Sequence, residues 1–322
     1  MSVDGSRIGA VIANLRARVA PVYERLQRTL VWQVWERMLE IEFVDRGVAL
    51  AGKAFVSFFP LVIVVAAFLP AHARHSVFTT LIDWFGLGGG ALVTVKRAFA
   101  SSDQIRRATG TLGLVLTIFY ATSFTTALQR VYLRSWRRPK GSPAGTYVRA
   151  PLWFLVLLVC MALLGTLSGL FGDGAELVVF AVVALAATSA LWLFTSWLML
   201  MGQVRWRVLI PSALLTAVAT DLFAVTARFW MPRTVTQNFT QFGFFGVALA
   251  LVTWFSGTAI CIVLGTCAGA VLAEDSGRLG RLIRGPKATM LVDGAPPELP
   301  APAGAPRARD ALRPADDDDD PS

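Results

Sequence analysis

The stretch TGTLGLVLTIFYATSFTTALQRVYLRSWRRP, residues 109–139, decides how the chain is organised. Residues 112–119 are almost purely apolar, and the residues after them carry hydroxyl groups before an arginine-rich end. A helix rises about 1.5 Å per residue, so residues 110–131 reach roughly 30 Å, the thickness of the hydrocarbon layer of a membrane. The stretch therefore predicts a membrane-spanning helix whose polar half faces other helices or water.

The composition extends this prediction to most of the chain. Of its 322 residues, 55% are hydrophobic and only 16% are charged, whereas a soluble protein carries nearer a quarter charged residues. The net charge of +9 is spread between the apolar runs, which favours membrane lipids of an anionic inner leaflet as partners over nucleic acid. Cys160, Cys261 and Cys267 all lie within apolar runs, so no disulfide framework is expected.

Six apolar runs predict an all-α, polytopic integral membrane protein. They cover about residues 48–69, 110–131, 151–170, 177–201, 208–229 and 242–272. Pro60, in the middle of the first run, removes a backbone hydrogen bond and is expected to kink that helix. Residues 70–108 hold two shorter apolar pieces, which predict short helices in the first outer loop. The polar residues 231–241 are predicted to form a loop between the fifth and sixth spans.

The segments on either side of this membrane domain, residues 47–275, have different patterns. Residues 1–30 are basic and weakly patterned, as in a cytoplasmic arm. Residues 31–46 have apolar residues at helical spacing, which predicts either an amphipathic interfacial helix or a helix packed on the ends of the bundle. Residues 276–322 are rich in Pro and Ala and end in an acidic run, so a disordered cytoplasmic tail is expected.

The distribution of Lys and Arg predicts the orientation of the chain. With six spans, most of these residues fall on the side of the two termini. Because Lys and Arg mark the cytoplasmic side, both termini are predicted to be cytoplasmic. Residues 70–108 are an exception, since they are basic and lie on the opposite side.

Three blocks of sequence resemble the YihY/BrkB family of bacterial inner-membrane proteins, over roughly residues 35–275. ALAGKAFVSFFPLVIVV, residues 49–65, carries a Ser-x-x-Pro element in Ser57 and Pro60. Residues 110–136 contain, toward their end, Leu128, Gln129 and Arg130, which are similar to a Leu-Asn-Arg box. The third block consists of RWRVLIPSALLTAVATDLFAVTARFW, residues 205–230, and FGFFGVALALVTWFSGTAICIVLGTCAGAV, residues 242–271. The resemblance implies a six-helix protein of the bacterial plasma membrane, with a role in envelope integrity or lipid handling and no agreed biochemical activity.

This sequence departs from the family pattern in particular residues. Lys53 stands where an apolar or aromatic residue is usual, Gln129 replaces an Asn, and Thr266 stands near a usual Gly-Ala-Glu element. The acidic residue usual in the fifth helix is Asp221.

Asp221 is the most informative single residue, because a carboxylate within a membrane span costs several kcal/mol unless it is paired, hydrated or protonated. Helical rise places Tyr120 of the second span at a comparable depth. The hypothesis is a polar groove between helices, lined by Asp221, Tyr120, Thr122, Thr126, Gln129 and Arg130. Two alternatives stay open: Asp221 locks helix packing, or the hydroxyl groups form a tight interhelical seam. Lys53 is expected to reach the membrane interface as an interfacial charge.

No enzyme chemistry is predicted. His72 and His75 have no third ligand close by, so neither a metal site nor a cofactor site is expected. A ribonuclease, the older label of the family, needs convergent metal-binding carboxylates, and Glu36, Glu40 and Glu42 do not supply them. The sequence instead predicts a non-enzymatic, transporter-like or lipid-handling envelope protein. The alternative is a scaffolding membrane protein with no transported substrate.

Overall fold

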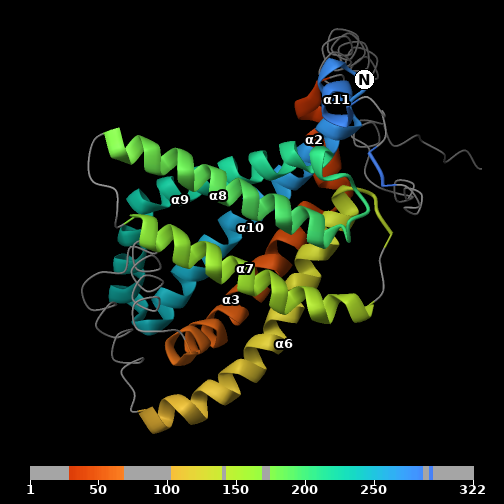
Figure 1. Cartoon of the computed structure of the whole chain (residues 1–322). Coiled ribbons are helices and arrows are strands. Elements are labelled where there is room, and N and C mark those ends of the chain that lie inside the picture. The colour runs from red at the N-terminus through yellow and green to blue at the C-terminus, as the bar shows by residue number, and fades with distance from the viewer. Residues whose placement is uncertain (1–28, 69–102, 140–142, 169–174, 286–289, 293–322) are drawn as a thin grey trace, which may run out of the picture.

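The computed structural model describes residues 29–68, 103–139, 143–168, 175–285 and 290–292 (Figure 1). These residues form helices α2 (Leu30–Glu40), α3 (Phe43–Phe68), α6 (Asp103–Ser135), α7 (Pro143–Ser168), α8 (Ala175–Met199), α9 (Trp206–Phe242), α10 (Phe244–Glu274) and α11 (Arg278–Arg284). The predicted all-α class is confirmed. The predicted basic arm, the short helices of the first outer loop and the acidic end lie outside the described residues.

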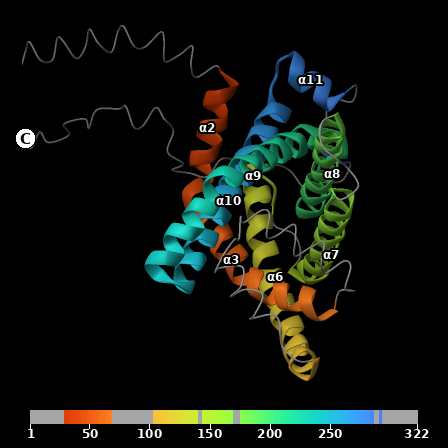
Figure 2. The same ribbon diagram turned by 90° about the vertical axis from the view of Figure 1, so that its left-hand side faces the viewer.

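The six long helices pack in a closed order. Helix α3 packs on α6, α6 on α7, α7 on α8, α8 on α9, α9 on α10, and α10 again on α3. Figures 1 and 2 show α7 and α8 running side by side, with α3 and α10 in another part of the bundle. Further contacts join α6 to α8 and α6 to α10 across this ring. One face of helix α6 is therefore directed toward the inside of the bundle.

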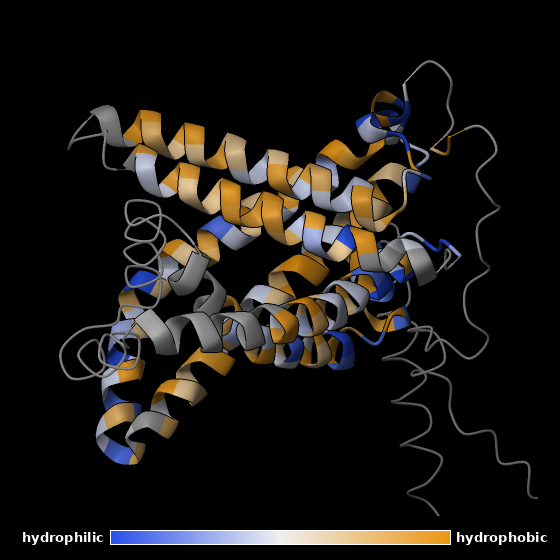
Figure 3. Ribbon diagram, turned by 60° about the horizontal axis from the view of Figure 1, so that its bottom comes forward, coloured by the Kyte–Doolittle hydropathy of each residue, from blue (hydrophilic) through white to orange (hydrophobic). Residues whose placement is uncertain are grey.

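Four of the helices are long and apolar enough to cross a membrane. They are Val148–Leu167, Val178–Met199, Trp206–Phe242 and Phe245–Glu274. Figure 3 shows hydrophobic residues along much of their lengths. Large apolar side chains such as Leu155, Val182 and Leu222 are exposed, as expected of surfaces that lipid covers. The chain is an integral membrane protein.

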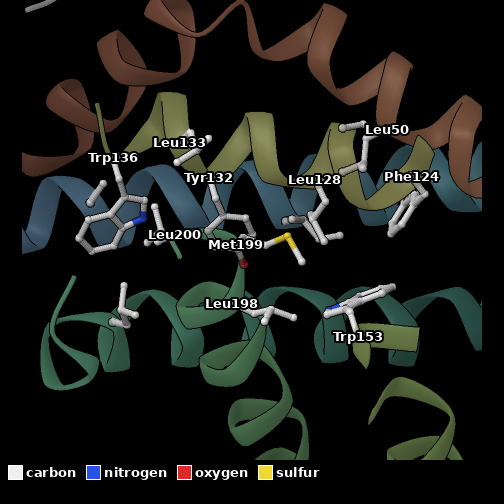
Figure 4. Packing of buried hydrophobic residues seen from close by; sticks show 14 of the residues in the cluster. Leu50, Phe124, Leu128, Tyr132, Leu133, Trp136, Trp153, Leu198, Met199 and Leu200 are labelled. Atoms are coloured by element: carbon white, nitrogen blue, oxygen red, sulfur yellow. The ribbon is translucent and has the colours of Figure 1, made fainter. Parts of the chain in front are cut away.

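The main core cluster joins α6 to α8 on the inside of the bundle. Leu128 and Tyr132 extend from α6 toward Leu198 and Met199 of α8 (Figure 4). Leu128, Tyr132 and Met199 are almost completely buried. The ring is therefore filled with packed side chains at this level.

Helices α9 and α10 form the closest pair. They are joined at Gly243, whose φ of 58° suits glycine. A Cβ atom added at Gly265 or Gly269 of α10 would lie under 3.0 Å from Thr216 or Ser212 of α9. The absence of a side chain at Gly265 and at Gly269 thus lets the backbones of α9 and α10 approach each other, as in other small-residue seams between membrane helices.

The predicted loop at residues 231–241 is wrong, because α9 continues as a helix to Phe242. Met231 and Val235 pack against α10 from this segment. The hydroxyl groups of Thr234, Thr236 and Thr240 donate to carbonyl oxygens of their own helix. Packing along one face therefore sustains a helix in a segment of polar composition.

Two other boundaries also differ from prediction. The helix expected over residues 31–46 is divided, since α2 ends at Glu40, Glu42 has a φ of 57°, and α3 begins at Phe43. The tail expected to be disordered from residue 276 begins instead with α11. Helix α3 runs as one continuous helix through Pro60.

Helix α2 is docked on the bundle by one face. Met38 and Ile41 are buried with Val131 of α6 and Val263 of α10, because the apolar positions of α2 recur at helical spacing. Val31 is 80% exposed on another face. This result supports the packed-helix alternative for α2, while contact of its other face with the membrane interface stays a prediction.

Candidate functional site

A network of charged side chains holds one end of the bundle together. Arg37 of α2 is only 4% exposed. Its two terminal nitrogens donate to the two carboxylate oxygens of Glu274 of α10, at 3.0 and 2.5 Å. One of them also donates to the carbonyl oxygen of Ser135, at the end of α6. Beside it, Arg137 donates to both oxygens of Glu40, at 3.0 and 2.7 Å. The network therefore clamps α2 to the ends of α6 and α10.

The turn between α8 and α9 joins the same end. Arg138 donates through Nε to the side-chain oxygen of Gln203 at 3.0 Å. The backbone of this turn pairs with a later segment, since Arg205 N–H donates to the Met290 carbonyl and Val292 N–H to the Gln203 carbonyl, each at 3.0 Å. The segment that follows α11 is thus tied to the α8–α9 turn.

Arginine residues are concentrated at this end among the described residues. Arg37, Arg46, Arg134, Arg137, Arg138, Arg205, Arg207, Arg278, Arg281 and Arg284 lie here. The opposite end has Arg106 and Arg107 of α6, and Arg228 and Arg233 of α9. The described arginines are therefore more numerous at this end of the bundle than at the opposite end.

Asp221 lies between α9 and α8. The Thr188 hydroxyl of α8 donates to its Oδ2 at 2.7 Å. One residue earlier, Thr220 accepts from the indole N–H of Trp192 at 3.3 Å. Sequence reasoning located this half-buried acid within the span, but it did not identify Thr188 as its partner. The described contacts of Asp221 thus lie on α8, whereas the other residues of the predicted groove belong to α6.

The predicted groove residues of α6 lie on two different faces. The hydroxyl groups of Thr122 and Thr126 donate to carbonyl oxygens of their own helix at 2.7 Å, and Arg130 is exposed. Tyr120 is partly buried, and its carbonyl oxygen accepts from Ser57 of α3 at 3.0 Å.

Gln129 belongs to the inner face instead, because it is 8% exposed and donates to the Met199 carbonyl of α8 at 3.4 Å. The structure therefore does not bring the six predicted residues together in one site.

Three hydroxyl groups that sequence reasoning missed lie on the inner face of α6. Thr117, Thr125 and Tyr132 are buried, and the oxygens of Thr117 and Thr125 make no hydrogen bond of standard geometry with any described residue. The Tyr132 hydroxyl faces those of Ser196 and Thr266 across the ring. Thr117, Thr125 and Tyr132 are separated by eight and seven residues, which places them on one helical face. This spacing is the feature of the sequence from which their common position could have been predicted.

Comparison with known proteins identifies the family. The family model of the virulence factor BrkB matches residues 34–286. The chain belongs to the BrkB family. No curated protein and no solved structure matches it.

The BrkB match includes more than the membrane helices, because it begins within α2 and ends just after α11. Arg37 and Glu274, which form the clamp, both lie inside it. The resemblance noted from sequence blocks is thus confirmed, and α2 and α11 are included in the BrkB domain.

The BrkB chain also has a lysine on the seam between α3 and α6. Lys53 of α3 donates to the carbonyl oxygen of Ser123 at 3.4 Å, which is a long hydrogen bond. Arg130 of α6 lies near enough to exert an electrostatic effect on Lys53. Lys53 is therefore bonded to α6 within the bundle and does not reach the membrane interface through this contact.

No group of three or more His, Cys, Asp or Glu side chains that would suit a metal ion occurs among the described residues. His72 and His75 lie outside that part of the chain. The polar groups described on the long helices therefore include hydroxyl groups, the carboxylate of Asp221, and the cationic side chains of Lys53 and Arg130.

Proposed function

We propose that the chain spans a bacterial plasma membrane six times, with α3 and α6 joining the four helices that are apolar and long enough to cross it. Both are members of the closed ring, so a membrane around the other four would also surround them. The arginine-rich end is the cytoplasmic end, because Arg and Lys are retained on that side. Helices α2 and α11 lie at this end, which supports the proposal that both termini are cytoplasmic.

Within that membrane the protein acts as a transporter-like protein, with a hydrated path along the inner face of α6. The observation that supports this function is that the buried hydroxyl groups of Thr117 and Thr125 have no hydrogen-bond partner among the described residues. A buried polar group left without a partner costs about 1–3 kcal/mol. Ordered water or a polar solute within the ring would remove this cost.

The proposal includes no enzyme activity, cofactor or nucleic-acid partner. Membrane lipids, anionic ones on the arginine-rich side, are its expected partners. A scaffolding protein without a substrate is the second candidate. The close approach of α9 and α10 favours it, since such a seam serves packing alone.

Cysteine labelling distinguishes the two functions. In a background with Cys160, Cys261 and Cys267 replaced by Ala, Thr117→Cys and Thr125→Cys are treated in sealed vesicles with a membrane-impermeant thiol reagent. Because thiols react as thiolates, they need water. Phe119→Cys is the matched control, since Phe119 lies on the same helix but is 67% exposed on its outer face.

The hydrated path predicts labelling at Thr117 and Thr125 from at least one side of the membrane, and none at Phe119. If both inner positions stay unlabelled from both sides, the interior is dry. The scaffolding function would then replace the transporter-like one.

A further inference from the structure

The turn between α8 and α9 presents an extended stretch of backbone that a later part of the chain occupies. Met201 and Gly202 have left-handed conformations, with φ of 57° and 69°, and residues 203–205 follow them before α9 begins. Residues 290–292, which we call the strap, lie antiparallel to this stretch, with Leu291 opposite Val204. The pairing is a single bridge, so among the described residues the strap does not belong to a larger sheet.

Three hydrogen bonds hold the strap on the turn. The Arg205 N–H donates to the Met290 carbonyl oxygen, and the Val292 N–H donates to the Gln203 carbonyl oxygen, each at 3.0 Å. The Nε of Arg205 donates to the Leu291 carbonyl oxygen at 3.1 Å. All three acceptors are main-chain carbonyl oxygens. The turn therefore recognises an extended backbone, as in the addition of a strand to an exposed edge.

The apolar side chains of the strap cover the arginine-rich end of the main core cluster. Met290 and Leu291 pack against this cluster. Val204, a member that is only 2% exposed, lies directly opposite Leu291. The same cluster continues along the inner face of α6 through Trp136 and Tyr132. The strap thus lies over the end of the core from which water would reach that face.

The attachment of the strap is limited in extent. Its last residue, Val292, is 43% exposed. A two-stranded pairing without further strands is only marginally stable in water. A short segment held in this way opens locally at a small cost, whereas the long helices around it do not.

We propose that the α8–α9 turn is a docking surface for an extended apolar segment, and that the strap occupies it to close the arginine-rich end of the hydrated path. Water and solute reach the inner face of α6 from this end when the strap detaches. The closing role rests on the proposed function, since it needs a path to close. The docking rests only on the contacts of residues 290–292.

Disulfide trapping tests the docking in the full chain. In the background with Cys160, Cys261 and Cys267 replaced by Ala, Val204→Cys and Leu291→Cys are combined and oxidised with copper phenanthroline. Opposed residues of this kind have Cα atoms about 4.5 Å apart, which a disulfide can span. We expect both free thiols to be lost.

A second cysteine pair serves as the control for random collision. It combines Leu291→Cys with Val31→Cys, because Val31 is 80% exposed on α2 at the same end. This pair should keep its free thiols under the same oxidation.

Thiol labelling of two shortened chains tests the closing role. Thr125→Cys is the reporter, in inside-out vesicles treated with a membrane-impermeant thiol reagent. In a chain that ends at Gly285 we expect labelling on the order of tenfold faster than in the full chain, because reagent enters the full chain only when the strap is detached. A chain that ends at Val292 is the matched control. It keeps the strap but lacks the acidic run, and it should be labelled as slowly as the full chain.

Two full-length variants provide the same test if the shortest chain fails to fold. Val292→Pro removes the N–H that donates to Gln203, while proline still favours an extended residue before it. This variant should speed the labelling of Thr125→Cys. Val292→Ala keeps the N–H, so its labelling rate should match that of the full chain.

The possible failures of the two proposals differ. Free thiols that persist in the Val204→Cys, Leu291→Cys pair would overturn the docking. Equal labelling rates in the chains that end at Gly285 and Val292, or in the two Val292 variants, would overturn the closing role. No labelling of Thr125→Cys from either side in any chain would refute the hydrated path and the closing role with it, whereas the disulfide would still report the docking.

Discussion

Replacement of Arg37 by Met is the sharpest test of how the BrkB domain holds α2. The side chain of Arg37 is 5% exposed and that of Glu274 is 27% exposed. Met keeps much of the apolar stem of Arg37 but removes the bidentate bond to Glu274 and the bond to the Ser135 carbonyl. The substitution therefore isolates the polar part of the clamp.

The expected loss of unfolding free energy depends on the Glu274 carboxylate, which keeps its charge after Arg37 is replaced. Removal of one partner of a buried ion pair costs about 3–5 kcal/mol, because the other charge stays buried. Glu274 is about a quarter exposed, so water compensates part of this loss and we expect about 2–3 kcal/mol. Glu40 adds little, since it keeps both hydrogen bonds from Arg137.

The assay is reversible unfolding in mixed micelles of mild detergent and dodecyl sulfate, followed by circular dichroism. Glu274→Met and the double variant complete a thermodynamic cycle with Arg37→Met. Because the double variant leaves no orphaned charge, it should be less destabilised than the sum of the single variants by about 1.5–2 kcal/mol.

Arg46→Met provides the control for this cycle. Arg46 pairs with Glu42 at 3.1 Å, but their side chains are 24% and 59% exposed. Such a surface pair contributes only about 0.3–0.5 kcal/mol. The reasoning is refuted if Arg37→Met costs no more than Arg46→Met, or if the two clamp substitutions are additive.

Further substitutions test the α9–α10 seam and the acid of α9 in the same unfolding assay. Gly265→Val should cost about 1–3 kcal/mol, because its side chain would meet Thr216; Gly52→Ala, with nothing within 4 Å of the added Cβ, should change stability by less than about 1 kcal/mol. Thr188→Val should cost about 1–3 kcal/mol by removing the described donor to Asp221. Asp221→Asn keeps an oxygen acceptor, so a loss as large as that of Thr188→Val would show that the negative charge itself is needed.

Much of the fold follows from the sequence, because lipid requires helices that are apolar on most sides. The runs at 151–170, 177–201 and 242–272 correspond to α7, α8 and α10 for this reason. The composition of residues 231–241 misled the prediction, although Ala227, Met231 and Val235, which pack against α10, recur at intervals of four residues. Periodicity was the better guide in this segment than mean polarity.

The partners within the site were less predictable, because they depend on the order of helices around the ring. Helical rise suggested Tyr120 as the neighbour of Asp221 at its level in the membrane. The rise does not say which helix lies beside α9. In the structure that helix is α8, and Thr188 is the hydrogen-bond donor. A non-local packing choice therefore separates the predicted groove from the observed contacts.

Helix α6 shows why a polar half at membrane depth need not describe one groove. Gln129 points to the inside of the bundle and Arg130, the next residue, is exposed on another face. Consecutive residues on a helix are about 100° apart, so a single aqueous groove would have to be wide to reach both. Gln129 donates to the Met199 carbonyl oxygen of α8 within the bundle, whereas Arg130 lies on the exposed face of α6. Two residues that follow each other in the sequence therefore serve two different surfaces of the helix, so the polar half of α6 does not define a single groove.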